Sequence, residues 1–369
     1  MYPDNLIYEI AFSSLRGMNR VLAGELLGRI HSEQAFFEAS SRQLGAVMGF
    51  DNKLFADDYR QKVLDEARRE ADFVIDNGIR PLYYTDSRYP SRLVDCDDAP
   101  LMLFTLGSAD LNSGHYVSVV GTRHATPYGI SFVNRLVEEL ASEVAGGITV
   151  VSGLAFGIDV AAHTAALKCG VPTVGVLAHG LNMIYPSQHR SVAAEMVRSG
   201  GLLMSDYRSG APVHKGNFVA RNRIVAGLCD CVVVAESAAK GGALITANIA
   251  SGYHRDVFAL PGRVCDRYSA GCNRLIASNT AALVQSASDV IDAMNWERKD
   301  SKPAQRELFV ELSTEEQAAV DYITTRGEAQ ANELAMSLNM SVGRVMSMLI
   351  DMEFKGVLLA YPGGKYRLT

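Results

Sequence analysis

The spacing of hydrophobic residues changes twice along the chain and divides it into three regions. Residues 1–75 carry apolar residues at helical spacing in LRGMNRVLAGELLGRI, in SEQAFFEAS and in a longer amphipathic segment from Phe55 to Asn77 that stops at Gly78. Residues 79–296 alternate short apolar runs with helical patterns, and residues 311–369 return mainly to helical spacing. The pattern therefore predicts a helical module, a mixed α/β domain and a second, mostly helical module.

The first region, residues 1–75, is predicted to be a small helical module of the helix-hairpin-helix or SAM-like type. The segment LRGMNRVLAGELL resembles a helix-hairpin-helix, whose glycine turn offers backbone N–H groups to a DNA phosphate. Asn19 occupies the place of that motif's second glycine, and the segment has few basic residues. A structural or protein-binding role is favoured here over DNA binding.

The middle region repeats a unit of one apolar strand followed by one helix. YVSVVG precedes YGISFVNRLVEELASEV, ITVVSG precedes FGIDVAAHTAALKCG, and CVVVAE precedes ALITANIASGYHR. Nearly continuous apolar strands that alternate with helices are typical of a parallel sheet covered on both faces. We therefore predict a Rossmann-like, doubly wound, mostly parallel α/β domain over residues 79–296, with RPLYY and LMLFTLG as strands that lead into it.

The last region begins after a charged segment, ERKDSKPAQRE, which predicts a linker over residues 297–310. STEEQAAVDYITTRG, ANELAMSLN and SVGRVMSMLIDMEFKG then predict three helices, and VLLAY and KYRLT predict a hairpin through PGG. Three helices and a hairpin predict a winged helix over residues 311–369. Its recognition helix offers only Arg344 to DNA, opposed by Asp351 and Glu353, which favours protein interaction or weak DNA binding.

Composition limits the kind of partner. The 369 residues carry a formal net charge of −6, so a polyanion site must be a local concentration of Lys and Arg. The first ten residues lack the pattern of a signal peptide, and the longest apolar runs are of strand length, too short to span a bilayer. The six cysteines form no repeated CxxC pairs, which argues against a zinc ribbon and for a reduced compartment. A cytoplasmic protein without a membrane span is expected.

Candidate chemistry gathers in the turns that follow the predicted strands, where open parallel sheets bind ligands. GTRHATPYG, SGLAFGID and ESAAKGGALIT place glycines near helix N-termini, where backbone N–H groups attract phosphate. No turn is a GxGxxG with a following acid or a Walker A loop, so neither a nicotinamide nor an ATP cofactor is predicted. The candidate anion-binding residues are Gly121, Gly153, Gly157, Gly241 and Gly242, with Arg123 and Lys240 as added cations.

The segment KGNFVARNR concentrates cations around one aromatic ring. Lys215, Phe218 and Arg221 are three residues apart and are expected on one side of a helix, an arrangement that suits a phosphate chain whose bases stack. The alternative is a solvated charged face with Phe218 in the core. Its place beside a predicted strand end favours the binding site, and Arg223 is expected to face elsewhere.

Two further patterns were weighed for chemistry. Asp159 and His163 stand at i and i+4 and can serve a metal, but such an Asp more often caps a helix while the His packs, so no metal is predicted. Glu236 is the best lone acid, and the alternative role for it is pairing with a cation or a helix N-terminus. No paired acid and base is recognisable, so no catalytic residue is predicted.

The motifs together resemble the DprA (Smf) family of DNA-processing proteins. VSVVGTRHATPYG, VVSGLAFGIDVAAHTAAL, FVARNRIVAGL and GGALITANIA occur in the family's order within residues 115–280. The resemblance implies a non-enzymatic homodimer that binds single-stranded DNA without sequence preference and loads RecA recombinase during natural transformation. It also implies that the strand is held by Arg123, Lys215, Phe218, Arg221 and Asn222, with Phe218 stacked on a base.

The chain departs from the family pattern at two places. Gly241 and Gly242 replace a Ser–Gly pair, and Asn279 and Thr280 replace a Gly–Ala pair. An alternative resemblance is to the nucleotide-processing hydrolases of the lysine-decarboxylase-like Rossmann group, with Glu236 as acid or base. Their PGGxGT loop is not matched here, because Arg263 follows Pro261 and Gly262.

Overall fold

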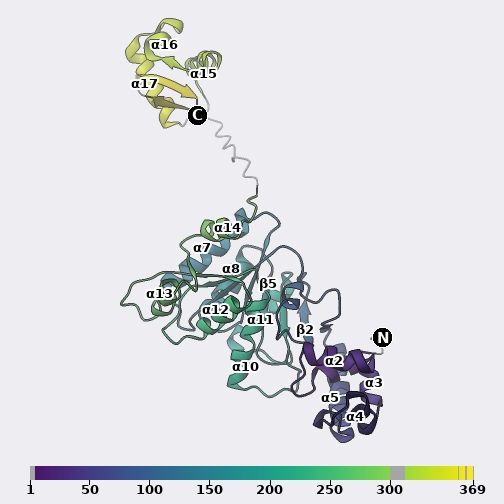
Figure 1. Ribbon diagram of the computed structural model, residues 1–369. Helices are drawn as coiled ribbons and strands as arrows, with labels where there is room; N and C mark the ends of the chain where they lie inside the picture. The colour runs from purple at the N-terminus through teal and green to yellow at the C-terminus, as the bar shows by residue number, and fades with distance from the viewer. Residues whose placement is uncertain (1–4, 300–311, 356, 362–363, 369) are drawn as a thin grey trace. The chain divides into compact units, whose positions relative to one another are not determined.

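The computed structural model describes residues 5–299, 312–355, 357–361 and 364–368 (Figure 1). The chain divides into two compact units between Asp300 and Ser301. The first unit carries one large sheet with its helices, and the second carries a small sheet with three helices.

The first unit is built on a nine-stranded sheet in the order β1-β2-β6-β5-β4-β3-β7-β8-β9. Neighbouring strands from β6 to β9 are parallel, whereas β1–β2 and β2–β6 are antiparallel. The predicted α/β fold with a mostly parallel sheet is therefore confirmed. The strands are β1 (Arg80–Tyr83), β2 (Met102–Gly107), β3 (His115–Val120), β4 (Ile148–Ser152), β5 (Thr173–Val176), β6 (Leu202–Ser205), β7 (Cys231–Val234), β8 (Asp256–Ala259) and β9 (Ala282–Leu283).

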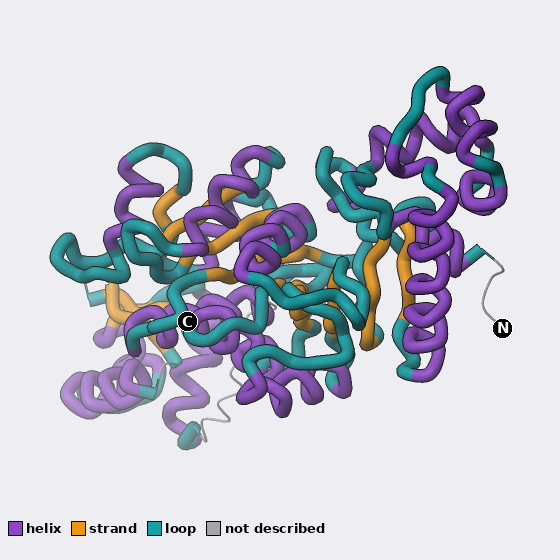
Figure 2. The backbone as a smooth tube through the Cα atoms, turned by 90° about the horizontal axis from the view of Figure 1, so that it is seen from below, coloured by secondary structure: helices purple, strands orange, loops and turns teal. Residues whose placement is uncertain are grey.

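Helices cover both faces of this sheet, and Figure 2 shows strands lying between helices. Along β3, Tyr116 and Val120 enter one hydrophobic core, while Val117 and Val119 enter the other. Strand β3 thus buries both faces, which explains its nearly continuous apolar sequence. The helices are α6 (Ser91–Val94), α7 (Pro127–Glu143), α8 (Ile158–Lys168), α9 (Arg190–Arg198), α10 (Lys215–Ala220), α11 (Asn222–Gly227), α12 (Gly242–Gly252), α13 (Ala270–Ala277) and α14 (Ala287–Ala293), with a 3-10 turn, η2 (Ser187–His189).

The strand order reverses between β3 and β7. The chain runs from β3 through β4 and β5 to β6 on one side, then returns to place β7 beside β3, with Val120 paired with Val234. Loops that leave two such neighbouring strands diverge to opposite sides and leave a crevice at the carboxyl ends. This crevice is where the predicted site residues were expected to meet.

The N-terminal helices share a hydrophobic core with the edge of the sheet. Tyr83, Met102 and Phe104, from β1 and β2, belong to the same buried cluster as the helical residues Ile10 and Phe36. The boundary expected between residues 75 and 79 therefore does not separate two cores. The helices are α1 (Leu6–Ser13), α2 (Arg20–Ile30), α3 (Glu33–Glu38), α4 (Ser41–Met48) and α5 (Asp57–Asp76), with a 3-10 turn, η1 (Lys53–Phe55).

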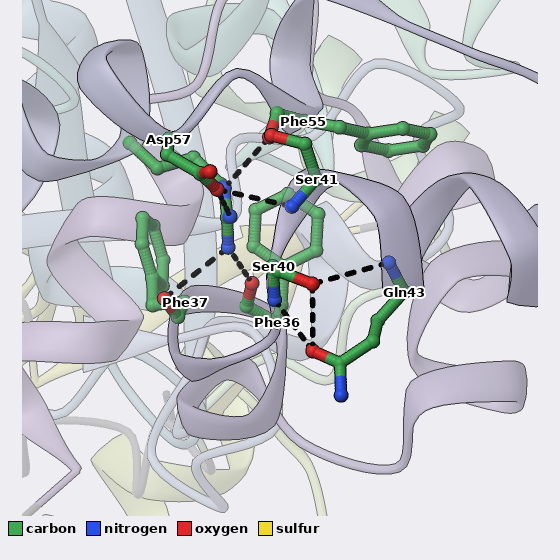
Figure 3. A network of polar contacts seen from close by, with 8 residues as sticks. Phe36, Phe37, Ser40, Ser41, Gln43, Phe55 and Asp57 are labelled. Carbon is green, nitrogen blue, oxygen red and sulfur yellow. Dashed lines mark hydrogen bonds and ion pairs between the residues drawn. The ribbon is translucent and has the colours of Figure 1, made fainter.

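A buried arginine fixes the loops among these helices. Arg60 donates hydrogen bonds to the carbonyl oxygens of Phe55 at 3.1 Å and Phe37 at 3.2 Å, and to that of Phe36. It also pairs with the carboxylate of Asp57 (Figure 3). The Arg60 guanidinium donates hydrogen bonds to several carbonyl oxygens at once. Arg60, which lies in α5, therefore links this helix to α3 and η1.

The first three residues of the expected linker belong to the first unit. Arg298 forms a bridge with Val144 and an ion pair of 2.7 Å with Asp292, and the Lys299 N–H donates to the Glu143 carbonyl oxygen at 2.6 Å. The sequence placed the linker start at residue 297 because these residues are charged, but Arg298 is paired with Glu143 and Asp292, and the Lys299 ammonium group donates to the Ala141 carbonyl oxygen. Residues 300–310 of the expected linker lie outside the described part.

The second unit contains α15 (Thr314–Arg326), α16 (Ala331–Ser337) and α17 (Val342–Phe354) around a small antiparallel sheet. The sheet has the order β10-β12-β11, formed by β10 (Ala329–Gln330), β11 (Leu358–Tyr361) and β12 (Lys365–Leu368). Arg344 of α17 is paired with Glu315 at 2.7 Å. In the described ranges of both units, no helix is long and apolar enough to cross a membrane.

Candidate nucleic-acid interface

A cavity of about 330 Å³ opens at the carboxyl ends of β3, β4 and β7, where the strand order reverses. The turns after these strands and the α10–α11 junction form its walls. Most of the predicted site residues line it, namely Gly121, Arg123, Gly153, Phe218, Arg221, Asn222, Gly241 and Gly242. The structure thus brings together residues separated by up to 121 positions in the sequence (242 − 121).

Three predicted residues lie beside the cavity rather than in its wall. Gly157 borders an adjoining hollow that Arg123 also lines. Lys215 is exposed at the start of α10, and Lys240 is exposed just before Gly241. Neither lysine has an ion-pair partner within the described ranges. Their charges are available to a ligand that extends out of the cavity.

Arg221 differs from the expectation of three residues on one helical face. Helix α10 ends at Ala220, and Arg221 turns inward between α10 and α11, only 5% exposed. Its guanidinium donates a hydrogen bond of 2.8 Å to the Gly153 carbonyl oxygen and another to the Val176 carbonyl oxygen. Arg221 therefore ties the ends of β4 and β5 together beneath the cavity, and Lys215 and Phe218 provide the accessible groups of this segment.

Asp159 supplies the charge opposite Arg221. It lies in the first turn of α8 and accepts hydrogen bonds from the Gly153 N–H at 3.2 Å and the Ala155 N–H at 3.4 Å. Burial raises the pKa of the Asp159 carboxyl, while the Arg221 charge acts to lower it. Burial likewise lowers the pKa of the Arg221 guanidinium, which Asp159 opposes. Arg221 and Asp159 both line the cavity, and each charge favours the ionised form of the other.

Arg123 and Phe218 meet at the mouth of the cavity. The Arg123 guanidinium carbon lies 5.7 Å from the centroid of the Phe218 ring, and the Tyr185 ring centroid lies 5.7 Å from it at an interplanar angle of 64°. Arg123 is exposed and Phe218 is half-buried. A guanidinium beside an aromatic ring can hold a phosphate while the ring stacks on the attached base.

Backbone hydrogen bonds join the turn that carries Arg123 to the segments that follow β7 and β4. The Thr122 N–H donates to the Glu236 carbonyl oxygen at 2.7 Å, and the Ile158 N–H donates to the Thr122 carbonyl oxygen at 3.2 Å. A side chain at Gly121 would meet Ile158 and the Glu236 backbone. The glycine is therefore required for a close approach of three segments, which holds Arg123 at a fixed place on the rim.

Helix α12 offers a second kind of anion-binding group. It begins at Gly242 with Gly241 as N-cap, and no side chain caps it. The first N–H groups of a helix have no partner inside the helix, and the helix dipole favours negative charge there. Because Gly241 and Gly242 line the cavity, these groups are accessible to a phosphate.

Glu236 is committed to a structural role. Its buried carboxylate accepts hydrogen bonds from the Thr126 N–H at 2.8 Å and the Thr126 hydroxyl at 2.5 Å, at the N-terminus of α7. A side chain at Gly129 would run into this carboxylate. The alternative of a helix N-terminus partner is thus confirmed, and the hydrolase hypothesis is not favoured because its acid is already engaged.

Asp159 and His163 are engaged with different partners. The His163 Nδ1 lies 2.7 Å from the Thr173 hydroxyl oxygen, which itself donates to the Val150 carbonyl oxygen, so His163 donates from Nδ1. Burial lowers the pKa of His163 to about 3. Among the described residues, no group of three or more His, Cys, Asp or Glu side chains is arranged to hold a metal.

Several cavity residues were not singled out from the sequence. Ser237 lines the cavity from the turn after β7, Thr246 lines it from α12, and Ala155 lines it from the β4–α8 turn. Each belongs to the turn or the helix that follows a parallel strand, and that position was the available signal. Their small or ordinary side chains gave no sign of ligand contact on their own.

The family model described as DNA recombination-mediator protein A matches residues 80–295. The chain belongs to this family. The match spans the sheet from β1 to β9 and therefore includes every residue of the cavity.

Individual relatives agree with the family assignment. The chain is 34% identical over 296 residues to Protein Smf of Synechocystis, an alignment that covers 78% of this chain and 72% of that protein. The crystal structure of DNA processing protein A from Streptococcus pneumoniae is similar with a TM-score of 0.63 at 32% identity, covering 79% of this chain and 98% of that one.

A second solved structure concerns single-stranded DNA. DNA processing protein A from Helicobacter pylori, whose structure is described in terms of its single-stranded DNA binding mode, matches with a TM-score of 0.53 and 29% identity. It covers 59% of this chain and 97% of that protein. Members of the family with this fold therefore include a single-stranded DNA binder.

Proposed function

We propose that this chain binds single-stranded DNA, without sequence preference, at the cavity between β3 and β7. The observation that carries the proposal is the placement of Arg123 over the Phe218 ring at the cavity mouth, 5.7 Å from the ring centroid. The ring stacks on a base, and Arg123, Lys215 and the N-terminus of α12 hold the neighbouring phosphates. Every base has a face on which a ring can stack, which accounts for binding without sequence preference.

The proposal also assigns roles to the buried residues. Arg221 and Asn222 support the cavity from below, and the glycines Gly121, Gly153, Gly157 and Gly241 allow the turns to approach the strand closely. No group around the cavity acts as a catalyst in this proposal: Glu236 caps α7, and the Asp159 carboxylate accepts hydrogen bonds from the Gly153 and Ala155 N–H groups.

The test is equilibrium binding of a fluorescent 20-nucleotide thymidine oligomer, followed by anisotropy. Phe218→Ala is expected to weaken binding by about 1–3 kcal/mol, the range for loss of one base–aromatic stack. Phe50→Ala is the matched control, because Phe50 is an exposed aromatic of the N-terminal helices, outside the cavity. Equal binding of wild type and Phe218→Ala at several salt concentrations contradicts the proposal.

We further propose that the protein acts as a homodimer that loads RecA on the bound strand. Membership of a recombination-mediator family supports this role. The test is the ATPase activity of RecA on single-stranded DNA that is already coated by a single-strand-binding protein. The chain is expected to shorten the lag of this reaction, and Phe218→Ala is expected to lose that effect; an unchanged lag contradicts the loading role.

Residues 312–368 are proposed to be a winged helix used for protein contact rather than for DNA. The order of three helices and a hairpin supports the assignment, and the ion pair of Arg344 with Glu315 occupies the one cation of α17 suited to DNA. The N-terminal helices are proposed to be a structural module, because their core is continuous with β1 and β2. Deletion of residues 301–369 is expected to leave oligonucleotide binding intact.

A further inference from the structure

Beyond the cavity mouth, two more exposed aromatic rings continue the line that begins at Phe218. Tyr185 is 49% exposed in the loop after β5, and Phe156 is 42% exposed in the β4–α8 turn. Neither ring is used by the cavity itself, since both lie outside its lining. Single exposed aromatics need no explanation, but a connected set on one rim does.

The connection runs through ring contacts. Tyr185 and Phe218 have ring centroids 5.7 Å apart, and Phe156 and His189 have centroids 4.9 Å apart at 70°. His189 belongs to the turn that follows Tyr185, and its N–H donates to the Pro186 carbonyl oxygen at 3.0 Å. The pairs Phe218–Tyr185 and His189–Phe156 are therefore linked through the single turn that carries both Tyr185 and His189.

Tyr185 and Phe156 each lie on a loop that is held by hydrogen bonds to a buried histidine. The Tyr185 N–H donates to His179 Nε2 at 3.2 Å, while His179 Nδ1 lies 2.9 Å from the Gly180 carbonyl oxygen. On the other loop, His189 Nδ1 lies 2.8 Å from the Leu154 carbonyl oxygen, two residues before Phe156. Two buried histidines thus fix the exposed rings, and fixed rings lose little conformational entropy when a ligand stacks on them.

The Phe156 turn also lies against the turn of Arg123. Gly157 has φ +78°, and a side chain there would meet the Thr122 carbonyl oxygen and the Arg123 backbone. Ala155 lines the cavity and Gly157 lines the adjoining hollow, so Phe156 stands between the two. Phe156 is therefore an exposed ring on a turn that borders both hollows.

Cations accompany the rings. Arg190, directly after His189, is exposed and has no ion-pair partner in the portions of the chain that the structure describes. Arg123 stands at the start of the series, and Lys215 lies one turn of α10 from Phe218. Rings that alternate with unpaired cations suit a chain of bases joined by phosphates, and do not suit an apolar peptide.

We infer that Tyr185 and Phe156 are second and third base-stacking positions, which extend the single-strand site from the cavity along the ends of β5 and β4. This inference rests on the proposed function, since it takes Phe218 as the first stacking position. The ligand is a single strand of several nucleotides, with Arg190 at a phosphate near the outer end. Tyr185 and Phe156 then set how many nucleotides contribute to affinity.

The test uses the full chain and thymidine oligomers of 3, 6, 9 and 12 nucleotides. Tyr185→Leu and Phe156→Leu keep an apolar side chain against the neighbouring histidine region but remove the flat ring. Each is expected to weaken binding of the 12-mer by about 5- to 140-fold, the range for one lost base–aromatic stack. Tyr185→Phe and Phe156→Tyr are expected to bind like wild type, since they keep the ring.

Three readouts separate stacking from other effects. The slope of log affinity against log salt is expected to be unchanged in both leucine variants, because no phosphate contact is lost. The affinity of Phe156→Leu is expected to reach its plateau at a shorter oligomer than that of wild type. The variants and wild type are expected to bind alike to a 12-mer of abasic sites, which has phosphates and no bases.

The outcomes distinguish this inference from the function on which it rests. If Phe218→Ala weakens binding but both leucine variants bind the 12-mer like wild type, the extended stacking series is wrong and the cavity site stands. If Phe218→Ala also binds like wild type, the proposed function fails first. If the leucine variants lose equal affinity for the abasic 12-mer, their effect is structural and the inference is overturned.

Discussion

The Gly153 carbonyl oxygen accepts a hydrogen bond of 2.8 Å from the Arg221 guanidinium, across 68 residues of sequence. A side chain at Gly153 would occupy the space of that guanidinium. The contact joins the end of β4 to the segment that carries Phe218. The lack of a side chain at Gly153 therefore helps to fix the position of the Phe218 ring.

Gly153→Ala is therefore expected to displace Arg221 and to destabilise the fold by about 1–3 kcal/mol, the usual cost of overpacking a buried site. Denaturant unfolding measures this change, and binding of the thymidine 20-mer is expected to weaken with it. Gly28→Ala is the control: Gly28 lies in α2 with open space around it, so a methyl group there is expected to be neutral or to stabilise by about 0.5–1 kcal/mol.

The loop between β6 and α10 is tied to the N-terminal helices. The buried Glu70 carboxylate of α5 accepts hydrogen bonds from the Ser209 N–H at 2.9 Å and from its hydroxyl group. Glu70→Gln is expected to destabilise the protein by about 1–3 kcal/mol, the range for a hydrogen bond to a charged group and a buried partner left unsatisfied. Weaker oligonucleotide binding is also expected, because the loop leads directly into Lys215.

Glu66→Gln provides the comparison on the same helix. Glu66 pairs with Arg208 at 2.9 Å, and both side chains are about one-third exposed, so its loss is expected to cost less than about 1 kcal/mol. Thermal unfolding and anisotropy of the two variants measure the difference. Equal effects of Glu66→Gln and Glu70→Gln contradict the view that the buried tie positions the loop.

His163 makes stability depend on pH. Burial lowers the pKa of His163 from 6.5 to about 3. As the pH falls, His163 is therefore protonated at a higher pH in the unfolded chain than in the folded chain. Its contribution is complete above pH 6.5 and is lost as the pH falls, by about 1.4 kcal/mol for each pH unit between 6.5 and 3. His163→Asn is expected to show a shallower loss of unfolding free energy between pH 7.5 and 5.5; parallel curves for the two proteins contradict this assignment.

Lys215→Ala and Lys240→Ala are expected to weaken binding most at low salt. Each lost phosphate contact reduces the slope of log affinity against log salt by about 0.7 for a single strand. Arg344→Ala, in the second unit, is the matched control, since its charge is already paired with Glu315. A slope for both lysine variants equal to that of wild type removes these residues from the interface.

The sheet could be predicted from the sequence because its strands are short apolar runs between helical patterns, and β7 (Cys231–Val234) coincides with CVVVAE. The antiparallel pairing of β1 and β2 could not, since residues 79–107 read only as strands and connectors. Both faces of a parallel strand are buried, whereas an edge strand gives a weaker pattern.

The glycine turns and Phe218 were predicted at one rim, and the structure places them there. The inward turn of Arg221 was missed, because FVARNRIVAGL reads as one continuous helix while the chain breaks between α10 and α11. The carbonyl groups that receive this guanidinium lie 45 and 68 residues away. Such long-range contacts decide whether a cation faces solvent or the interior, and no local pattern encodes them.

Photocrosslinking identifies the ring that stacks on the bound base. A thymidine 12-mer that carries one 5-iododeoxyuridine reacts under light with an aromatic ring stacked on the modified base, and peptide mapping identifies that ring. We expect the crosslink to fall on Phe218 and to disappear in Phe218→Ala, while Phe50 remains unmodified. A crosslink confined to residues 312–368, or one unchanged by Phe218→Ala, would rule out base stacking on Phe218.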